Sequence, residues 1–265
     1  FNRFRSRIMF PIQDYKGNII AFGGRIFDND DPAKYQNSPE TPIYFKSKTL
    51  YGIYQNSQNI RESKKIILVE GYMDLIQLVQ AGINNCLAIS GTAFTEGHAT
   101  ILKRYSSNVY VTFDGDDAGK KAAIRCGYIL AANSLDPHII TPPDGKDPDE
   151  LIRENTAMWD RSIDTAEPFM DFYINSMISK FDTDTNDGKH SAVLAVSPLI
   201  LSTTNSFDQD RYFNLLAEKL KVDRQLLELN VSKSISNQRR ITNRPPKTIE
   251  KPIFLTDRRD YLEDY

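Results

Sequence analysis

The 265-residue sequence has few of the residues that form cross-links, with two cysteines and three histidines. Cys86 and Cys126 are too few for a disulfide framework or a four-ligand zinc site, so we expect two buried, small apolar side chains in a reducing compartment. The histidines lack metal-ligand spacing, and we assign His98, His138 and His190 to structural or exposed positions. The sequence therefore predicts neither a disulfide-rich nor a zinc-binding protein.

Long apolar runs are also missing. The longest, such as residues 66–69 and 109–111, fall far short of the roughly 18 residues that a membrane span requires. No charged and apolar leader opens the sequence, so we expect neither secretion nor membrane contact. The first residue is Phe1 rather than Met, which predicts a fragment of a longer protein. The 40% hydrophobic content still allows one large domain or two small ones.

Charge is unevenly distributed, although the net charge is only −2. Residues 1–65 hold 11 Lys and Arg against 6 Asp and Glu, whereas residues 66–150 hold 6 against 11. Chance can give a bias of this size. A division of roles is the sharper interpretation, in which the basic block attracts phosphates and the acidic block collects carboxylates that need a cation between them.

Hydrophobic periodicity predicts an α/β fold (α+β overall) with a mostly parallel central sheet and flanking helices. Short strands at residues 7–12 and 18–25 come first. Strands at 65–69, 86–89, 109–113 and 139–141 then alternate with helices at 72–82, 95–105 and 119–132, which is the pattern of right-handed crossovers. Four more helices are expected at residues 169–177, 192–201, 211–220 and 224–231.

These patterns divide the chain into five parts. We expect a small basic subdomain at residues 1–63, the sheet domain at 64–145 and a helical subdomain at 146–231. Residues 232–253 are rich in Ser, Asn, Arg, Lys and Pro, which is typical of a flexible linker. Residues 254–265 read as the truncated start of a further region.

Carboxylates follow two of the predicted buried strands at the point where each strand ends. Glu70 follows residues 66–69, and Asp114 and Asp116 follow residues 109–113. The carboxyl ends of the strands form the ligand-binding edge of an open parallel sheet. Carboxylates this close repel one another unless a proton or a cation intervenes, and an all-oxygen ligand set indicates Mg²⁺ or Mn²⁺. The sequence therefore predicts phosphoryl or nucleotidyl chemistry at this edge.

A plainer interpretation remains open at this point, because Asp-Gly-Asp is also common turn chemistry. Two other phosphate or cation motifs are excluded. The acids of residues 144–150 fall at positions 1, 4 and 6, which does not fit a calcium-binding loop. Residues 115–120 have one residue too few between their glycines for a P-loop, and Lys121 stands where a Ser or Thr would bind Mg²⁺.

Several ordered motifs resemble one known family. Residues 69–74 (VEGYMD) and 113–119 (FDGDDAG) resemble the Toprim fold that bacterial primases and topoisomerases share. Further motifs narrow the resemblance to the DnaG-type bacterial primases, and they lie at residues 3–12, 23–25, 34–41, 46–52 and 143–149. The resemblance runs almost continuously from residue 1 to about residue 149, and the helical tail is loosely similar to the end of the primase core.

The resemblance implies a Toprim-type metal-binding domain within a DNA primase catalytic core. Such an enzyme is a nucleotidyltransferase, a DNA-directed RNA polymerase that makes short RNA primers on single-stranded DNA from ribonucleoside triphosphates by two-metal chemistry. Glu70, Asp114 and Asp116 would be the catalytic acids and hold Mg²⁺ or Mn²⁺. Asp147 and Asp149 match further metal-site acids, and Asp74 would support the site. Zinc would belong only to an N-terminal domain that is absent here.

The resemblance also gives the basic block a role. Template and nucleotide phosphates would contact a groove lined by Arg3, Arg5, Arg25, Lys34 and Lys46. Tyr35 and Tyr44 would either stack on bases or belong to the core, whereas Arg7, Lys48, Lys64 and Lys65 are expected to be mainly solvated. A replicative helicase would bind through a missing C-terminal domain that begins at residues 254–265. The core is expected to be monomeric and to work in the bacterial cytoplasm, at the replication fork.

Three alternatives remain at the level of the sequence. A Toprim nuclease or topoisomerase would also act on DNA phosphodiesters, but none of the 13 tyrosines stands out as a nucleophile. A haloacid-dehalogenase-type phosphatase also ends a strand with Asp-x-Asp, but it would have Thr or Val near Ala118. A non-catalytic DNA-binding fragment of the replisome is opposed by the full set of acids.

Overall fold

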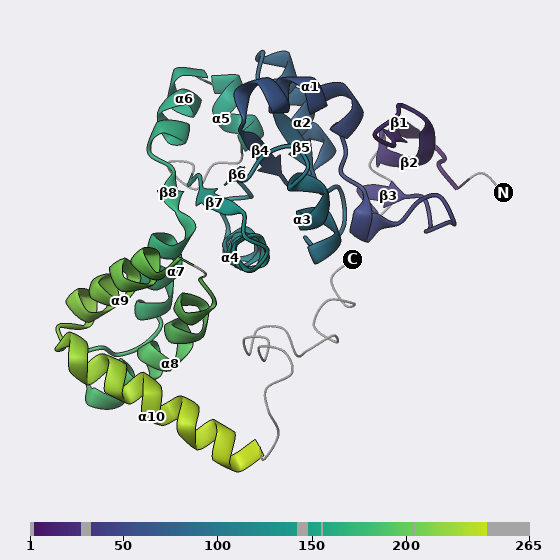
Figure 1. Ribbon diagram of the computed structural model, residues 1–265. Helices are drawn as coiled ribbons and strands as arrows, with labels where there is room; N and C mark the ends of the chain where they lie inside the picture. Colours follow the sequence, from purple (N-terminus) through teal and green to yellow (C-terminus); the bar gives the residue numbers. More distant parts are fainter. Residues whose placement is uncertain (1–2, 28–32, 142–147, 155, 204, 243–265) are drawn as a thin grey trace. The chain divides into compact units, whose positions relative to one another are not determined.

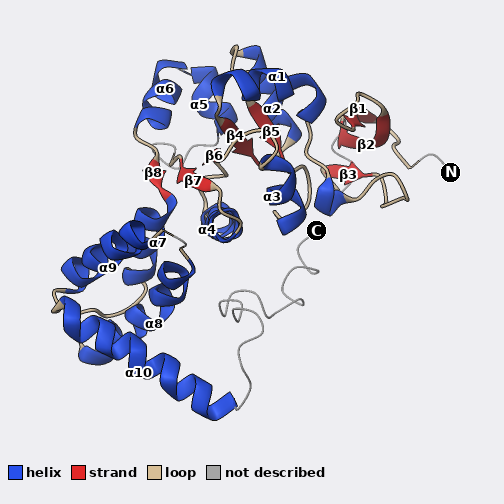
Figure 2. Cartoon of the chain, viewed as in Figure 1, coloured by secondary structure: helices blue, strands red, loops and turns tan. Residues whose placement is uncertain are grey.

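The structure, a computed structural model, describes residues 3–27, 33–141, 148–154, 156–203 and 205–242. The chain forms two compact units, Phe1–Phe169 and Met170–Tyr265 (Figure 1). The first unit holds two sheets with their covering helices, and the described part of the second unit is helical (Figure 2). Within the described residues, the structure contains no helix that is both long and apolar enough to span a membrane.

The first sheet is small and antiparallel, with the strand order β1-β2-β3. Its strands are β1 (Arg7–Gln13), β2 (Ile19–Ile26) and β3 (Tyr35–Asn37). The first two confirm the predicted strands, and β3 is a short strand that the sequence pattern did not predict. One face of the sheet buries Phe10, Ile12 and Ala21 against Tyr44 and Tyr72. The basic block is thereby packed against the first turn of a helix in the central domain.

A 3-10 turn, η1 (Lys46–Lys48), and helix α1 (Ile53–Ser63) connect the two sheets. The sequence analysis predicted no helix before residue 72, so α1 is a correction. Its buried residues are Ile53, Asn56 and Ile60, which have helical spacing, but a polar side chain occupies the middle position. Asn56 is satisfied there because its Nδ2 donates a hydrogen bond to the carbonyl of Cys86 at 2.8 Å. Because the buried residue Asn56 is polar, the sequence does not show the apolar spacing that is typical of a helix.

The second sheet has five strands in the order β5-β4-β6-β7-β8. It confirms the expected mostly parallel architecture, since β4, β5, β6 and β7 are parallel to their neighbours and only β8 is antiparallel. The bounds are β4 (Ile66–Val69), β5 (Cys86–Ala88), β6 (Asn108–Val111), β7 (Asp136–Ile139) and β8 (Glu167–Pro168). Strand β7 begins three residues and ends two residues earlier than predicted, and Pro137 lies inside it.

Five helices accompany this sheet. They are α2 (Tyr72–Gln80), α3 (Glu96–Leu102), α4 (Asp117–Ala132), α5 (Pro148–Glu154) and α6 (Thr156–Asp164). The last two were not predicted, and they contribute Leu151, Ile152 and Trp159 to the same buried cluster as Ile67 and Val69. The structure therefore groups residues 148–164 with the sheet, although the sequence analysis assigned them to the helical subdomain.

The second unit contains α8 (Asn186–Ser202), α9 (Ser206–Leu220), α10 (Arg224–Thr242) and most of α7 (Phe169–Ile178). Thr185 and Asn205 cap α8 and α9 through their side-chain oxygens. Helix α10 extends to Thr242 and so enters the predicted linker at residues 232–253. Apolar residues at positions 227, 231 and 235 have helical spacing, which continues past residue 231, where the predicted helix ends. Residues 254–265 lie outside the described residues.

The junction of α4 with Phe169 gives a test of the packing. A Cβ on Gly127 would overlap the Phe169 ring. Helix propensity alone favours Ala over Gly by about 1 kcal/mol, whereas overpacking costs about 1–3 kcal/mol. We expect Gly127→Ala to lower the free energy of unfolding, measured by urea denaturation of the chain. Gly127→Ala with Phe169→Leu should lose less than the sum of the single changes. A stabilised Gly127→Ala variant would contradict this packing.

Candidate active site

The site lies where two neighbouring strands of the central sheet end. Strands β4 and β6 are parallel and adjacent, with Leu68 paired to Val111, and the amide of Thr112 donates to the carbonyl of Leu68 at 3.0 Å. Glu70 comes directly after β4, and Asp114 follows β6 by three residues. Both residues are partly buried. The sheet register thus brings together two acids that are 44 residues apart in the sequence.

Asp116 joins this edge as the residue that begins α4. Its Oδ1 accepts a hydrogen bond from the amide of Gly119 at 2.7 Å, which is the usual N-cap contact. Gly119 is required here because a Cβ would overlap the backbone carbonyl of Asp114. The tight turn from Asp114 to Gly119 therefore keeps the two aspartates next to each other. One oxygen of Asp116 is occupied by the cap, and the side chain is otherwise exposed.

Asp74 stabilises the turn that carries Glu70. Its Oδ2 accepts a hydrogen bond from the amide of Gly71 at 2.8 Å, across the first turn of α2. An acidic residue in the first turn also interacts favourably with the helix dipole. Asp74 therefore acts on the site through the backbone of the residue that follows Glu70.

The pKa of Glu70 indicates how closely the acids lie together. Burial raises the pKa of Glu70, and the negative charges of Asp114, Asp74 and Asp116 raise it further, to about 7. A backbone hydrogen bond at Asp114 partly opposes the rise. The carboxylates are therefore close enough to destabilise one another's charge, which is the condition under which a proton or a cation is taken up.

The structure describes some, but not all, of the five acids that were predicted to bind a metal ion. Within the described residues, no group of three or more His, Cys, Asp or Glu side chains is arranged to hold a metal ion. The two further acids from the sequence analysis lie at or beyond the edge of the described residues. Asp147 lies outside the described residues, and Asp149 is in α5 with its side chain not described. The metal assignments of Glu70, Asp114, Asp116, Asp147 and Asp149 therefore remain predictions.

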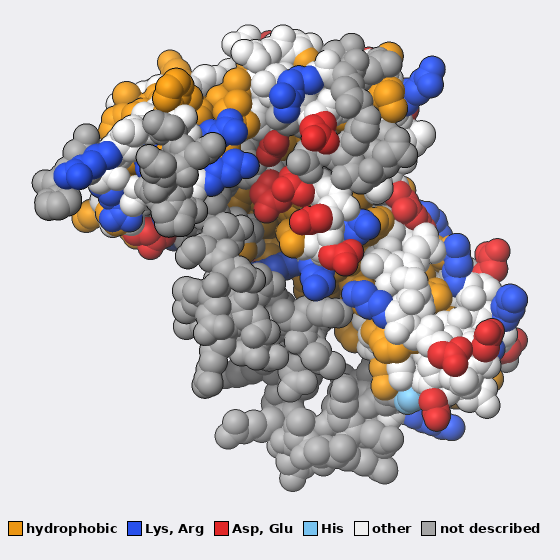
Figure 3. All heavy atoms as spheres, turned by 180° about the vertical axis from the view of Figure 1, so that it is seen from behind, with side chains coloured by type: hydrophobic (Ala, Val, Ile, Leu, Met, Phe, Trp, Pro, Cys, Tyr) orange, Lys and Arg blue, Asp and Glu red, His pale blue; other side chains and the backbone are white. Residues whose placement is uncertain are grey.

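The predicted basic residues lie on or beside the small sheet. Arg3 and Arg5 precede β1 and are exposed, Arg25 is in β2, and Lys34 is exposed just before β3. The guanidinium of Arg25 lies 5.8 Å from the ring centroid of Tyr35, on the paired residue of β3. In the space-filling view, Asp and Glu side chains gather in one patch with Lys and Arg side chains next to them (Figure 3).

Two basic segments are held in ways that the sequence did not indicate. Arg7 was expected to be mainly solvated, but its Nη2 donates to the carbonyl of Ala33 at 2.9 Å and its Nη1 to that of Gly24 at 3.3 Å. Arg7 therefore fixes the segment that carries Lys34. Hydrogen bonds from a side chain to backbone carbonyls, such as these two, give no signal in the sequence.

Lys46 is held by the start of α3. His98 is fully buried, its Nδ1 accepts from the amide of Thr95 at 3.2 Å, and its Nε2 lies 2.8 Å from the carbonyl of Lys46. The ring is therefore the tautomer that donates from Nε2 to Lys46. Burial lowers the pKa of His98, which favours this neutral form. The hydroxyl of Thr95 donates to the carbonyl of Ser47 at 2.6 Å. His98 is thus structural, as expected.

Other side chains from the sequence analysis are clearly placed. Tyr44 is 2% exposed, so it belongs to the core rather than to a base-stacking surface, whereas Tyr35 is 38% exposed. Cys86 and Cys126 are buried free thiols, as expected.

Three family models match the chain. The first is the N-terminal domain of the DNA primase catalytic core, which matches residues 1–57. The second is described as Toprim-like and matches residues 67–152. The third is the DnaB-helicase binding domain of primase, which matches residues 170–225. The last match falls within the described helices of the second unit, and not at residues 254–265, where the sequence analysis expected a helicase-binding region to begin.

Relatives and solved structures agree with these models. The DNA primase of Clostridium acetobutylicum is 39% identical over 89% of this chain, which spans 40% of that protein. A DnaG primase catalytic domain bound to single-stranded DNA is 36% identical, with a TM-score of 0.77 over 85% of this chain and 72% of the other. The zinc-binding and RNA polymerase domains of Aquifex aeolicus primase give a TM-score of 0.69 at 30% identity, over 84% of this chain and 54% of theirs.

The parallel sheet, with acids at the ends of β4 and β6, and the matching model define a protein of the Toprim class. The basic sheet that precedes it and the relatives narrow the class further. The chain belongs to the DnaG-type bacterial DNA primases, which are enzymes, and it corresponds to part of their catalytic core. It spans less than half the length of the curated relatives that it matches.

The charge crowding at Glu70 predicts a specific pH response in metal-free protein. Because the folded-state pKa lies above that of the unfolded chain, the folded protein holds a proton that the unfolded chain releases near pH 4.5. The stabilisation from this group is present at low pH and is lost as the pH rises from about 4.5 to about 7. Glu70→Gln should remove this part of the pH dependence, measured by thermal unfolding from pH 4 to 8.

Carbon-13 NMR titration of the Glu70 carboxyl gives a direct check. Asp116→Asn should lower the pKa of Glu70, because one of the repelling charges is lost. Asp136→Asn is the matched control, since Asp136 is exposed at the opposite, amino end of β7 and should leave that pKa unchanged. A Glu70 carboxyl that titrates at its ordinary pKa would contradict the crowding.

Proposed function

We propose that this chain is the nucleotide-joining part of a bacterial DNA primase, which makes RNA primers on single-stranded DNA from ribonucleoside triphosphates. The observation that carries the proposal is the crowding of Glu70, Asp114 and Asp116 at adjacent strand ends, beside a sheet that carries basic side chains. The family membership supports the reaction class. The proposal places the reaction in the bacterial cytoplasm, at the replication fork.

The acids suit a divalent cation, and their chemistry in this structure supports that fit. All donors are carboxylate oxygens, and burial together with the neighbouring negative charges raises the pKa of Glu70 to about 7. Hard oxygen donors favour Mg²⁺ or Mn²⁺ over softer metals. Glu70, Asp114 and Asp116 would hold the ion, with Asp147 and Asp149 as further candidates. Zinc is assigned only to a separate N-terminal domain of the whole protein, and the Aquifex primase structure comprises zinc-binding and RNA polymerase domains.

A bound divalent cation would supply the positive charge that stabilises a nucleotide's phosphates and activates the attacking hydroxyl. The chain's own residues have distinct tasks around it. Glu70 would be ionised when it holds the ion, Asp74 keeps the Gly71 turn fixed, and Asp116 is oriented by its cap on Gly119. These contacts pre-organise the acids before the substrates arrive.

The basic sheet would bind the template and nucleotide phosphates. Arg3, Arg5 and Lys34 are exposed, so they can reach a polyanion, and Arg25 is oriented by Tyr35. The backbone of Lys46 is fixed by His98. Phosphate contacts by such side chains release counterions, so template binding should weaken as salt increases.

Primer synthesis by the full-length protein tests the proposal. With a single-stranded template, ribonucleotides and Mg²⁺, the wild type should extend RNA, and Asp116→Asn should reduce the rate by about 100-fold or more. Asp136→Asn, which changes an exposed acid at the other end of the sheet, is the control and should keep full activity.

Binding of Mn²⁺ supplies the second readout. Asp114→Asn should abolish Mn²⁺ binding measured by electron paramagnetic resonance, while Asp136→Asn preserves it. Labelled DNA that is cleaved rather than copied would support the nuclease alternative. Template binding with no synthesis by the wild type would support the non-catalytic alternative.

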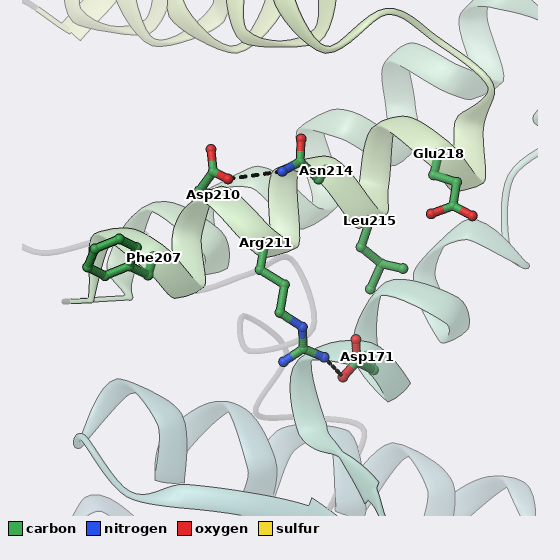
Figure 4. Close-up of a pocket in the computed structure, with 7 residues that line it drawn as sticks. All are labelled: Asp171, Phe207, Asp210, Arg211, Asn214, Leu215 and Glu218. Carbon is green, nitrogen blue, oxygen red and sulfur yellow. Dashed lines mark hydrogen bonds and ion pairs between the residues drawn. The ribbon is translucent and has the colours of Figure 1, made fainter.

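We also propose that the second unit contributes to binding of the replicative helicase. Its helices match the family model named for that helicase, and α9 carries an unusually exposed aromatic, Phe207, at 84%. Phe207 and Leu215 line a groove of about 420 Å³ between α7 and α9 (Figure 4). Three acids line it as well, and one of them, Asp171, is paired to Arg211 at 2.6 Å.

The groove therefore has a net negative charge and an apolar anchor. It fits a helicase segment with a basic side chain next to an apolar one, since aromatic anchors carry much of the binding energy at interfaces. Asp210 is held by Arg224 at 3.0 Å, so this wall of the groove is fixed. The groove lies wholly within the second unit, and the proposal needs no particular arrangement of the two units.

Titration of the full-length protein with the replicative helicase of the same bacterium tests this surface. Phe207→Ala should weaken the affinity at least about tenfold, because an exposed aromatic anchor is lost without loss of the core. Tyr54→Ala, which removes a 48% exposed aromatic from α1, is the control and should leave the affinity unchanged. Equal affinities for wild type and Phe207→Ala would exclude the groove.

A further inference from the structure

A closed set of hydrogen bonds joins the basic sheet to the acid-bearing strand ends. The hydroxyl of Tyr72 donates to Oδ1 of Asn37 at 2.8 Å, and Nδ2 of Asn37 donates to the carbonyl of Ser90 at 3.1 Å. The amide of Ser90 in turn donates to the carbonyl of Glu70 at 2.9 Å. Glu70 precedes Tyr72 by two residues, so the backbone closes the ring. We call these four residues the Tyr72–Asn37 circuit.

The circuit connects three separate elements. Asn37 ends β3 in the basic sheet, Tyr72 begins α2, and Ser90 lies just beyond β5. Only one orientation of the Asn37 amide satisfies both neighbours, because the carbonyl of Ser90 accepts and never donates. The circuit therefore fixes the end of β3 to the carbonyl of Glu70 through directional contacts.

The surroundings are shaped to fit this circuit. Tyr72 is 2% exposed, and its ring stacks on Phe10 with the centroids 4.9 Å apart and meets Tyr51 edge-on at 4.7 Å. A Cβ on Gly23 would lie 2.7 Å from the Tyr72 hydroxyl, and a Cβ on Gly91 would press on Nδ2 of Asn37. Gly91 also has a φ of +80°, which favours glycine.

We propose that Tyr72 and Asn37 are positioning residues that set the spacing between the basic sheet and the carboxylates. The proposal deepens the proposed function and rests on it. Arg25 is in β2 and Lys34 immediately precedes β3, so they move with Asn37, while Glu70 moves with Ser90 and Tyr72. Phosphates bound by the sheet and an ion bound by the acids must meet at a fixed distance, and a misplacement of about 1 Å can cost about 100-fold in rate.

Loss of the circuit should therefore separate catalysis from binding. Tyr72→Phe keeps the stacked ring and removes only the hydroxyl, and Asn37→Ala removes the centre of the circuit. In the full-length protein, we expect kcat for primer synthesis to fall about tenfold or more. The Kd for single-stranded DNA and the Kd for Mn²⁺ should stay within about twofold, because each half-site is intact. The double variant should lose no more than Asn37→Ala alone.

The matched control is Tyr51→Phe, which removes a hydroxyl from the ring that meets Tyr72 edge-on, outside the circuit. It should keep the wild-type kcat. Unchanged kcat in Tyr72→Phe would overturn the proposal. So would a parallel loss of kcat, of both affinities and of Tm, since that pattern describes general destabilisation rather than positioning.

Amide hydrogen exchange of the full-length protein tests the circuit without reference to activity. In Tyr72→Phe, peptides that contain Asn37 and Ser90 should exchange faster, while peptides from β4 and β6 keep their protection. Uniformly faster exchange, or no change at Ser90, would overturn the circuit. A wild type that makes no primers would refute the proposed function instead, and the exchange result would still decide whether the circuit exists.

Discussion

Mutual repulsion among carboxylates at the ends of β4 and β6 is the constraint on which the site depends. The register of these two parallel strands brings Glu70 beside Asp114, and the turn before α4 adds Asp116. Burial and three neighbouring charges raise the pKa of Glu70 to about 7, so its proton is retained to a higher pH than that of an ordinary carboxyl. In the proposed function a cation would replace that proton, because the strand register holds the carboxylates close together.

The rest of the first unit is arranged around this edge. Three backbone-directed contacts by Asp74, Arg7 and His98 hold, respectively, the turn of Glu70, the segment of Lys34 and the backbone of Lys46. None of these three residues needs to contact a substrate in order to keep the backbone of the site in place. In this unit, the candidate site therefore includes side chains that hold the backbone in place.

Much of this arrangement was predictable from sequence because strand periodicity and strand-end acids are local signals. Apolar runs identified β4 and β6, and the acids after them identified the edge of the sheet. The misses share a physical cause, since the burial of polar groups has no local signature. Asn56 concealed α1 because its amide is satisfied by Cys86, a residue 30 positions away. Asn37 and Tyr72 appeared only as motif members, because their partners come from three elements that the fold brings together.

Helix α4 begins at the acid edge and carries Gly127 ten residues further on, where Phe169 fits against its backbone. At a rise of about 1.5 Å per residue, those points are roughly 15 Å apart along one rigid rod. Phe169 is also the last residue before the second unit begins. Because Phe169 packs against Gly127, a displacement of Phe169 would reach the same helix that is capped by Asp116.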